Sequence, residues 1–319
     1  MKLSFSTRGW NDLSWDTWLD TAGEMKFTGI EVYNLFKSPA LTGKGGPFPP
    51  HRLAATIRQL RDRKLAIPCL DSSLDLTMSI ADGDLVAGLI RTAQESQIPY
   101  VACWASRGGD EGEELLRRNM AALLPLAEER SVCILIKTSG IFADTARLRG
   151  FLERYASDYL GALWDMHHPY RDFGESADAT IKNLGTYVRH VHLRDSDDDG
   201  SYNLIGEGTL PVSDMMRALS SINYDGFISL EWKPEWMEDL TDREIIFPHF
   251  VNFMSRFRST RKRKKSLYYN HDGTGQYVWK KDDLIDLTFP QVLDRMVEEF
   301  PDQYAFKYTT LDYTRTYAE

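Results

Sequence analysis

Eight short apolar runs alternate with eight amphipathic helical patterns along most of this chain, and this alternation restricts the fold more than any other feature. The runs are 3–7, 29–33, 65–71, 100–105, 132–137, 161–165, 188–194 and 226–232. The helical patterns are 16–25, 52–63, 84–96, 113–129, 145–155, 177–184, 212–222 and 243–257. Strands and helices that alternate with short connections form parallel βαβ units, and eight units close a barrel. We therefore predict an α/β fold, a (β/α)8 TIM barrel.

The chain is longer than one barrel requires. Its 319 residues exceed the roughly 250 that are typical of the fold. A basic run follows the last helical pattern, at 261–265, and is more often a solvated linker than a nucleic-acid or targeting patch. An amphipathic helix is predicted over 288–300 and a hairpin over 305–317. We expect a barrel at 1–257, a basic linker at 258–287 and a short C-terminal appendage at 288–319.

The composition is that of an acidic protein with a large core. With 42% hydrophobic residues, the chain can bury enough apolar surface to exclude disorder throughout. A formal net charge of −9 disfavours binding to a phosphate backbone. No stretch approaches the ~20 apolar residues of a membrane span, and the start lacks a signal-peptide core. We expect a cytoplasmic protein that binds neither nucleic acid nor membrane.

Cysteines and helix-start signals give more local expectations. Cys69, Cys103 and Cys133 lie inside apolar runs and are odd in number, so we expect buried thiols rather than disulfides. Ser14 and Ser213 stand at the start of helical patterns and are candidate N-caps.

Three strand candidates carry, at or near their carboxyl ends, a side chain that can bind a divalent cation. Because residues i and i+2 of a strand share a face, Asp165, His192 and Glu231 should point into the barrel near its carboxyl end, where barrel enzymes keep their chemistry. Trp164, Leu193 and Trp232 should face the helices. Such an N/O cluster suits Mn²⁺, Mg²⁺, Co²⁺ or Zn²⁺. A buried network of acids and histidines without metal is an equal alternative.

Four motifs resemble the sugar phosphate isomerase/epimerase superfamily, the xylose isomerase-like barrels. They are Ala-Leu-Trp-Asp-Met-His-His-Pro-Tyr, His-Val-His-Leu-Arg-Asp-Ser, Gly-Glu-Gly-Thr-Leu-Pro and Ser-Leu-Glu-Trp, and the resemblance covers residues 1 to about 257. It implies one divalent metal, held by a Glu of strand five together with Asp165, His192 and Glu231. It also implies that the two glutamates move a proton beside a sugar carbonyl and that His168 binds the substrate.

One position departs from that family pattern. Lys137, in Ile-Lys-Thr-Ser-Gly, stands where relatives carry the strand-five Glu. An ammonium about 4 Å from a divalent ion costs on the order of 8 kcal/mol at an effective dielectric of 20. Either Lys137 stays charged, bonds Asp165 and Glu231 and replaces the metal, or its pKa falls and it acts as a neutral base. We favour replacement, because two neighbouring carboxylates stabilise the ammonium; metal binding would then be weak or absent.

Further residues are candidates for substrate contacts. Glu31 lies within the second strand candidate and Asp71 ends the third, so both could contact a substrate. For each, a buried acid that is hydrogen-bonded within the barrel is an equal alternative. Trp104 could stack on a sugar, as could Trp10 and Trp15, although packing is the better explanation for each tryptophan. His167 and His168 are adjacent, so one should point into the site and the other away from it.

The appendage has a resemblance of its own. About 30 residues, from Thr-Phe-Pro-Gln-Val-Leu-Asp to Tyr-Thr-Arg-Thr-Tyr-Ala-Glu, are similar to the opening of adenylate-forming acyl-CoA ligases. The Ser/Thr/Gly-rich phosphate loop of that family is absent, so the chain should not adenylate anything.

Two functions of different class follow from these patterns. The first is an isomerase or epimerase, or a dehydratase, that acts on a small sugar, sugar phosphate or cyclitol by proton transfer beside a carbonyl, with a metal site altered by Lys137. The alternative is a non-catalytic small-molecule-binding barrel attached to a ligase module. An endonuclease is less favoured, because the chain is acidic and its seven histidines are too sparse for a multi-zinc cluster. A Schiff base at Lys137 and a homo-oligomer both stay open.

Overall fold

The computed structural model describes residues 1–79, 83–237, 240, 242–257, 288–302, 304–308 and 313–317. The chain divides into two compact units, Met1–Phe257 and Arg258–Glu319. No helix in these ranges has both the length and the apolar character that crossing a bilayer requires.

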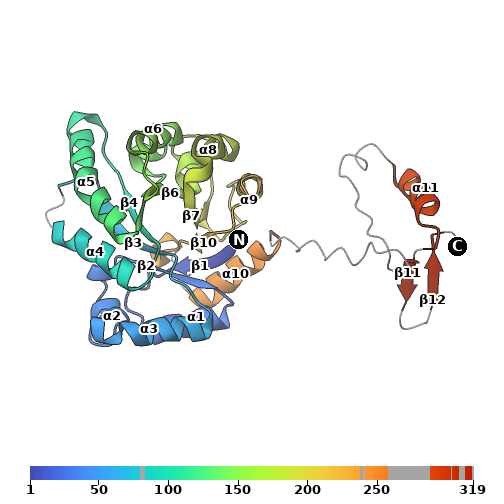
Figure 1. Ribbon diagram of the computed structural model, residues 1–319, viewed down its shortest axis with the longest axis horizontal. Helices are drawn as coiled ribbons and strands as arrows, with labels where there is room; N and C mark the ends of the chain where they lie inside the picture. Colours follow the sequence, from blue (N-terminus) through green and yellow to red (C-terminus); the bar gives the residue numbers. More distant parts are fainter. Residues whose placement is uncertain are drawn as a thin grey trace. The chain divides into compact units, whose positions relative to one another are not determined.

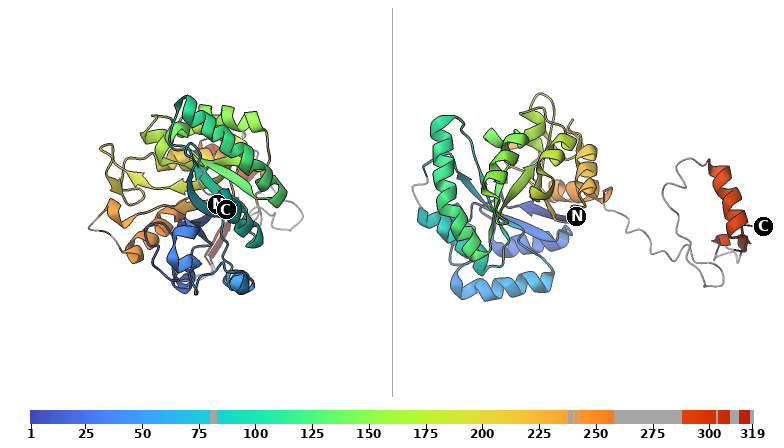
Figure 2. Two further views of the ribbon diagram at one scale, coloured as in Figure 1. Left: turned by 90° about the vertical axis from the view of Figure 1, so that its left-hand side faces the viewer. Right: turned by 45° about the horizontal axis from the view of Figure 1, so that its top comes forward.

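The first unit is a closed parallel barrel of eight strands, as predicted (Figures 1 and 2). The strands follow one another around the barrel in chain order and β1 pairs with β10, which closes the ring. Their bounds are β1 Lys2–Ser6, β2 Gly29–Tyr33, β3 Cys69–Asp75, β4 Tyr100–Trp104, β5 Cys133–Lys137, β6 Leu160–Asp165, β7 Val188–Leu193 and β10 Phe227–Leu230.

Eight longer helices surround these strands, and each lies within a few residues of its predicted range (Figure 1). They are α1 Trp15–Glu24, α3 Pro50–Arg63, α4 Gly83–Glu95, α5 Gly109–Arg130, α6 Thr145–Tyr155, α8 Ala177–Leu184, α9 Val212–Ser221 and α10 Arg243–Ser255. Shorter elements lie in the connections: helices α2 Pro39–Thr42 and α7 His167–Arg171, strands β8 Asp195–Ser196 and β9 Tyr202–Asn203, and 3-10 turns at Leu35–Lys37, Gly140–Phe142, Gly185–Tyr187 and Pro234–Trp236.

Two local predictions need correction. The third strand begins at Cys69 rather than at 65, because Pro68 has no N–H to donate, and it continues past a register shift in which Ser73 takes a left-handed conformation with φ 57°. Ser213 is not an N-cap, since α9 begins at Val212 behind Pro211. Ser14 does cap α1 and accepts a hydrogen bond from the Thr17 amide at 3.1 Å.

Side chains of the strands alternate between two apolar regions, as the period of two requires. Trp164, Leu193 and Trp232 belong to the core between barrel and helices, which confirms their outward position. A smaller cluster fills part of the barrel interior and consists of Cys69, Ala102, Cys133, Leu135 and Leu163. All three cysteines are free and buried, as predicted.

Aromatic packing attaches the last helix to the first strand. Phe247 of α10 is fully buried, and its ring centroid lies 4.7 Å from that of Phe5 on β1 and 5.5 Å from that of Phe27. Burial of one such side chain stabilises the fold by about 1.5–3 kcal/mol. The barrel is therefore closed by side-chain packing as well as by the pairing of β1 with β10.

The second unit contains the predicted helix and hairpin. Helix α11 spans Phe289–Glu299 and begins with a capping box between Thr288 and Gln291. Strands β11 Tyr304–Tyr308 and β12 Tyr313–Thr316 pair antiparallel. The predicted linker, with its basic run, lies outside the described residues.

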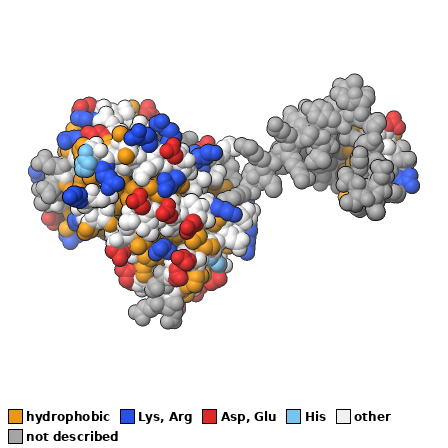
Figure 3. Space-filling view, turned by 90° about the horizontal axis from the view of Figure 1, so that it is seen from below, with side chains coloured by type: hydrophobic (Ala, Val, Ile, Leu, Met, Phe, Trp, Pro, Cys, Tyr) orange, Lys and Arg blue, Asp and Glu red, His pale blue; other side chains and the backbone are white. Residues whose placement is uncertain are grey.

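The surface of the barrel carries both signs of charge. Figure 3 shows acidic and basic side chains intermingled on one face, with hydrophobic side chains between them. This face has no stripe of one sign.

Candidate active site

A cavity of about 330 Å³ lies at the carboxyl ends of the barrel strands. Five of the residues predicted for the site line it: Asp71, Trp104, Lys137, Asp165 and His168. They come from β3, from the ends of β4, β5 and β6, and from α7, so the barrel brings together residues that are far apart in the sequence. Two further predicted residues, His192 and Glu231, are fully buried and lie outside this lining.

Glu231 is held by three cations. Its Oε1 accepts a hydrogen bond from the Arg8 guanidinium, its Oε2 accepts one from Arg194, and the Lys137 ammonium lies 3.7 Å from Oε1. Burial alone would raise the pKa of the Glu231 carboxyl, but Lys137, Arg194 and Arg8 hold it well below its usual range. Glu231 therefore stays ionised as the centre of a buried charge network.

Lys137 points into the site, but its bonding differs from the prediction. Its Nζ donates to Asp71 Oδ2 at 3.1 Å and pairs with Glu231, whereas Asp165 was the expected second partner. Burial disfavours the ammonium, yet Asp71 and Glu231 raise the pKa of Lys137 above its ordinary value. The neutral-base alternative is thus disfavoured in this charge environment.

Arg194 takes the place beside Asp165 that the prediction gave to Lys137. Arg194 Nη2 donates to Asp165 Oδ2 at 2.9 Å and to His168 Nε2 at 2.6 Å. Its guanidinium also lies 5.5 Å from the centre of the Trp236 ring. Burial works against the charge on Asp165, but Arg194 lowers the pKa of that carboxyl below its ordinary value. Arg194 therefore bonds both Asp165 and Glu231, two of the three predicted metal ligands.

Sequence reasoning missed Arg8 and Arg194 as site residues. Arg8 stands two residues after Ser6 at the end of β1, and Arg194 stands two residues after the inward His192. The i+2 rule that selected the ligands could have found both arginines. Lys233, two residues after Glu231, also lines the cavity and has no acidic partner within ion-pair distance among the described residues.

Glu31 lies within the barrel rather than in the cavity lining, because its carboxylate holds two histidines. His190 Nε2 lies 2.6 Å from Glu31 Oε2, and His192 Nε2 lies 2.8 Å from Glu31 Oε1. Burial raises the pKa of the Glu31 carboxyl, but His192 and His190 together lower it well below the ordinary value. These bonds favour the alternative of a hydrogen-bonded barrel acid for Glu31, and a contact with substrate stays a prediction.

The two adjacent histidines take different directions. His168 lines the cavity, and its Nδ1 bonds Asp172 while its Nε2 faces Arg194. His167 is buried, bonds Ser196 Oγ at 3.0 Å and stacks on Tyr202. His168 is therefore the histidine that a bound molecule can reach.

The three candidate tryptophans lie in different environments, one in the cavity lining and two in the core. Trp104 lines the cavity and its indole N–H donates to the Ser73 carbonyl at 3.3 Å. Trp10 and Trp15 are buried in the core outside the barrel, so packing explains both. Tyr202 and Trp236, which were not predicted, add a stacked aromatic pair to the cavity lining, with ring centroids 4.1 Å apart.

The predicted ligand set does not fit a resident divalent ion in this arrangement. The oxygens of Asp165 and Glu231 that face the site already bond guanidinium groups, and Lys137 occupies the position of the fourth ligand. Potential ligand atoms of Asp71, His192 and Glu231 do come within 4.8 Å of one another, but two of these residues are bound by Lys137. Three fixed cations would repel a divalent ion there.

Comparison with known proteins agrees with this architecture. The model of the xylose isomerase-like TIM barrel family matches residues 19–247. The chain belongs to that family. It is 22% identical over 264 residues to the fructoselysine 3-epimerase of Shigella flexneri, a match that covers 75% of this chain and 92% of that protein.

Two solved structures illustrate the similarity of fold. The probable 3-DHS dehydratase AsbF of Bacillus anthracis superposes with a TM-score of 0.68 at 17% identity and covers 80% of this chain and 99% of that one. The IOLI protein with a bound zinc atom superposes with a TM-score of 0.66 at 16% identity. The superposition covers 81% of this chain and 100% of that one. At these identities the similarity establishes the fold of this family member.

Proposed function

We propose that the barrel binds a small sugar, sugar phosphate or cyclitol in the cytoplasm and moves a proton at the carbon next to its carbonyl group, as an isomerase or epimerase. A dehydratase would share this first proton step. The observation that carries the proposal is the pair of Glu231 and Lys137, 3.7 Å apart at the strand ends where barrel enzymes keep their chemistry. Family membership and the similarity to an epimerase support the reaction class.

In this proposal, side-chain cations replace the divalent metal of the family. Lys137, Arg8 and Arg194 supply positive charge where an enolate oxygen would develop, which is the part of such a reaction that benefits most from fixed charges. Glu231 takes the proton from carbon, and the Lys137 ammonium, once drawn away from Glu231 by the substrate, returns one, to the neighbouring carbon in an isomerase or to the opposite face of the same carbon in an epimerase. A proton passed from Glu231 back to Lys137 then restores both groups.

The geometry sets a condition on this mechanism. Glu231 lies beneath the cavity lining, covered by Arg8, Lys137 and Arg194. Oxygens of the substrate must draw Arg8 and Lys137 towards them before Glu231 can reach a carbon-bound proton. His168, Asp71 and Trp104 line the same cavity and are the groups that would hold the hydroxyls and the sugar face.

Hydrogen exchange in D₂O tests the proposal directly. The full chain is incubated with fructose, tagatose, allulose, their 6-phosphates and an inosose, and loss of the proton next to the carbonyl is followed by NMR. We expect exchange with at least one compound, unchanged by EDTA. Glu231→Gln and Lys137→Met should each slow it by about 100-fold or more, the usual range for an acid or base. Lys182→Met on the exposed side of α8 is the control.

A second function is favoured by the same covered carboxylate. Because three cations hold the pKa of Glu231 well below its usual range, it is a weak base in the unliganded site. A barrel that only binds such compounds, beside a C-terminal fragment that resembles the start of an acyl-CoA ligase, would fit this feature. Thermal shifts with the same sugars but no exchange with any of them would support this binding role and contradict the enzyme.

A further inference from the structure

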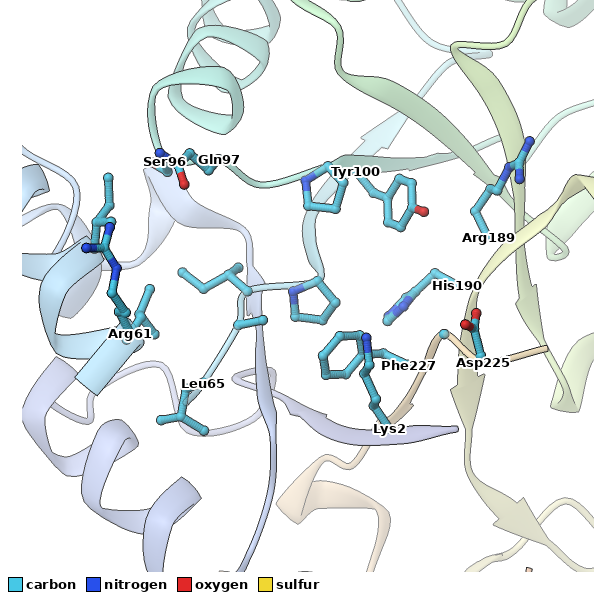
Figure 4. A pocket seen from close by; sticks show the side chains of 17 residues that line it. Lys2, Arg61, Leu65, Ser96, Gln97, Tyr100, Arg189, His190, Asp225 and Phe227 are labelled. Atoms are coloured by element: carbon cyan, nitrogen blue, oxygen red, sulfur yellow. The ribbon is translucent and has the colours of Figure 1, made fainter. Parts of the chain in front are cut away.

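We propose that the opposite end of the barrel holds a second binding site, for a small organic anion with a flat apolar body. A cavity of about 460 Å³ lies there (Figure 4). Its lining comes from the amino-terminal ends of the strands, at Lys2 of β1, Tyr100 of β4 and His190 of β7. None of these residues lines the candidate active site. The volume falls within the range of pockets that hold small molecules.

The inner wall of this cavity is apolar. Leu60, Leu65 and Ile67 are buried there, and Phe227 adds a ring over which the Lys2 ammonium lies, 5.3 Å from the ring centroid. Figure 4 shows the His190 ring between Tyr100 and Phe227, directed into the space that the lining side chains surround. A planar apolar molecule could contact the aliphatic side chains while its anionic group meets the Lys2 ammonium beside Phe227.

Two buried polar atoms on different sides of the cavity have no hydrogen-bond partner (Figure 4). They are Ser96 Oγ and His190 Nδ1, and the two side chains are 9% and 0% exposed. The other ring nitrogen of His190 is already engaged by Glu31 and by Ser229. Because His190 Nε2 donates to Glu31, Nδ1 of the neutral ring can only accept, so its partner would be the O–H or N–H of a water or ligand and not an anionic group.

The rim selects the charge of that ligand. Lys2, Arg61 and Arg189 line the cavity against a single acid, Asp225. Across the described part of the chain, none of these three cations forms an ion pair with a carboxylate. An anionic group at the rim would meet positive charge that no protein carboxylate neutralises. A neutral sugar would match neither this rim nor the apolar wall.

Binding of simple fluorinated probes to the full chain tests this site. The probes are 4-fluorobenzoate and 4-fluorophenyl phosphate, with 4-fluorobenzyl alcohol as the neutral analogue and acetate as an anion without a ring. We expect ¹⁹F titrations to give saturable binding of at least one anionic probe, about tenfold or more tighter than the alcohol. Acetate should not compete at equal concentration.

Matched variants locate the bound probe. Arg61→Gln combined with Arg189→Gln should weaken anionic-probe binding by about tenfold or more. Arg58→Gln, an exposed residue of the same helix α3 that does not line the cavity, should leave it unchanged. Lys233→Gln, in the candidate active site, should also leave it unchanged.

Three results would overturn the proposal. The first is absence of binding up to about 10 mM of every probe, which would leave water as the partner of Ser96 and His190. The second is binding that survives the double arginine variant. The third is binding that Lys233→Gln removes, since the probe would then occupy the candidate active site. The test uses no sugar substrate, so its failure is independent of the proposed enzymatic function.

Discussion

The Lys137 ammonium nitrogen of β5 lies 3.1 Å from Asp71 Oδ2 of β3, and β4 is the one strand between them in the barrel. The same nitrogen is 3.7 Å from Glu231 Oε1. One lysine therefore neutralises carboxylates from two other strands, where relatives of this family are expected to carry a glutamate. The charges of the site are balanced by side chains, and the stability of the barrel depends on that balance.

Removal of the ammonium should destabilise the protein. Lys137→Met leaves Asp71 and Glu231 buried with one cation fewer, and breaking a buried pair in this way costs about 3–5 kcal/mol. We expect the free energy of unfolding in urea to fall by about that amount. The exposed control Lys182→Met should change it by less than about 0.5 kcal/mol. Equal losses of unfolding free energy in the two variants would show that Lys137 contributes no more to stability than an exposed lysine.

A double-mutant cycle isolates the pair. Asp71→Asn removes the charge that Lys137 contacts, so the combined variant should lose less free energy than the sum of the single losses. We expect a coupling of about 1–3 kcal/mol, the range for residues of one ionic network. Additive losses would mean that Glu231, rather than Asp71, is the partner that matters.

Conversion to a metal site should require two substitutions. Lys137→Glu restores the fourth ligand of the family pattern, but Arg194 still bonds Asp165 and Glu231. We expect Lys137→Glu with Arg194→Ala to bind one Mn²⁺ or Zn²⁺ per chain, and Lys137→Glu alone to bind at least about tenfold more weakly. Metal content after dialysis and the metal-dependent rise of Tm measure both. Tight stoichiometric binding by Lys137→Glu alone would show that Arg194 moves aside.

The barrel and the inward residues of its late strands could be predicted from sequence because each depends on a local rule. Alternation along β6, β7 and β10 placed Asp165, His192 and Glu231 inside and their neighbours outside. The rule needs only the period of a strand. It works without knowledge of which strands face one another.

Partner choice could not be predicted in this way. Asp71 is the partner of Lys137 because β3 and β5 flank β4 and direct these side chains to the same point of the barrel mouth, a relationship that no local pattern contains. Alternation could have placed Arg194 on the inward side, but its long side chain can reach several acids, so its bonds to Asp165 and Glu231 could not be predicted. Glu31 bonds His190 and His192 through the closed interior, so closure of the barrel decides its role.

The three cysteines should resist modification in the native state. Burial raises the pKa of Cys103 and of Cys133 to about 12 and holds that of Cys69 well above its usual range. At pH 8 only on the order of one such thiol in ten thousand is ionised, and the thiolate is the reactive form. We expect no reaction with Ellman's reagent until the protein is unfolded, and then three thiols per chain. Ser213→Cys, at an exposed position, should react at once.

Acid should weaken the barrel through Glu31. Its carboxyl pKa is lowered in the folded state, so it contributes stability above its unfolded value near pH 4.5 and loses that contribution as pH falls further. Glu31→Gln keeps the shape but not the charge, and should cost about 3 kcal/mol or more at pH 7 by leaving His190 and His192 without an anion. The difference in unfolding free energy between the unaltered protein and Glu31→Gln should become smaller from pH 5 to pH 3. Urea titrations across that range measure it, and a constant difference would mean that Glu31 is uncharged in the native protein.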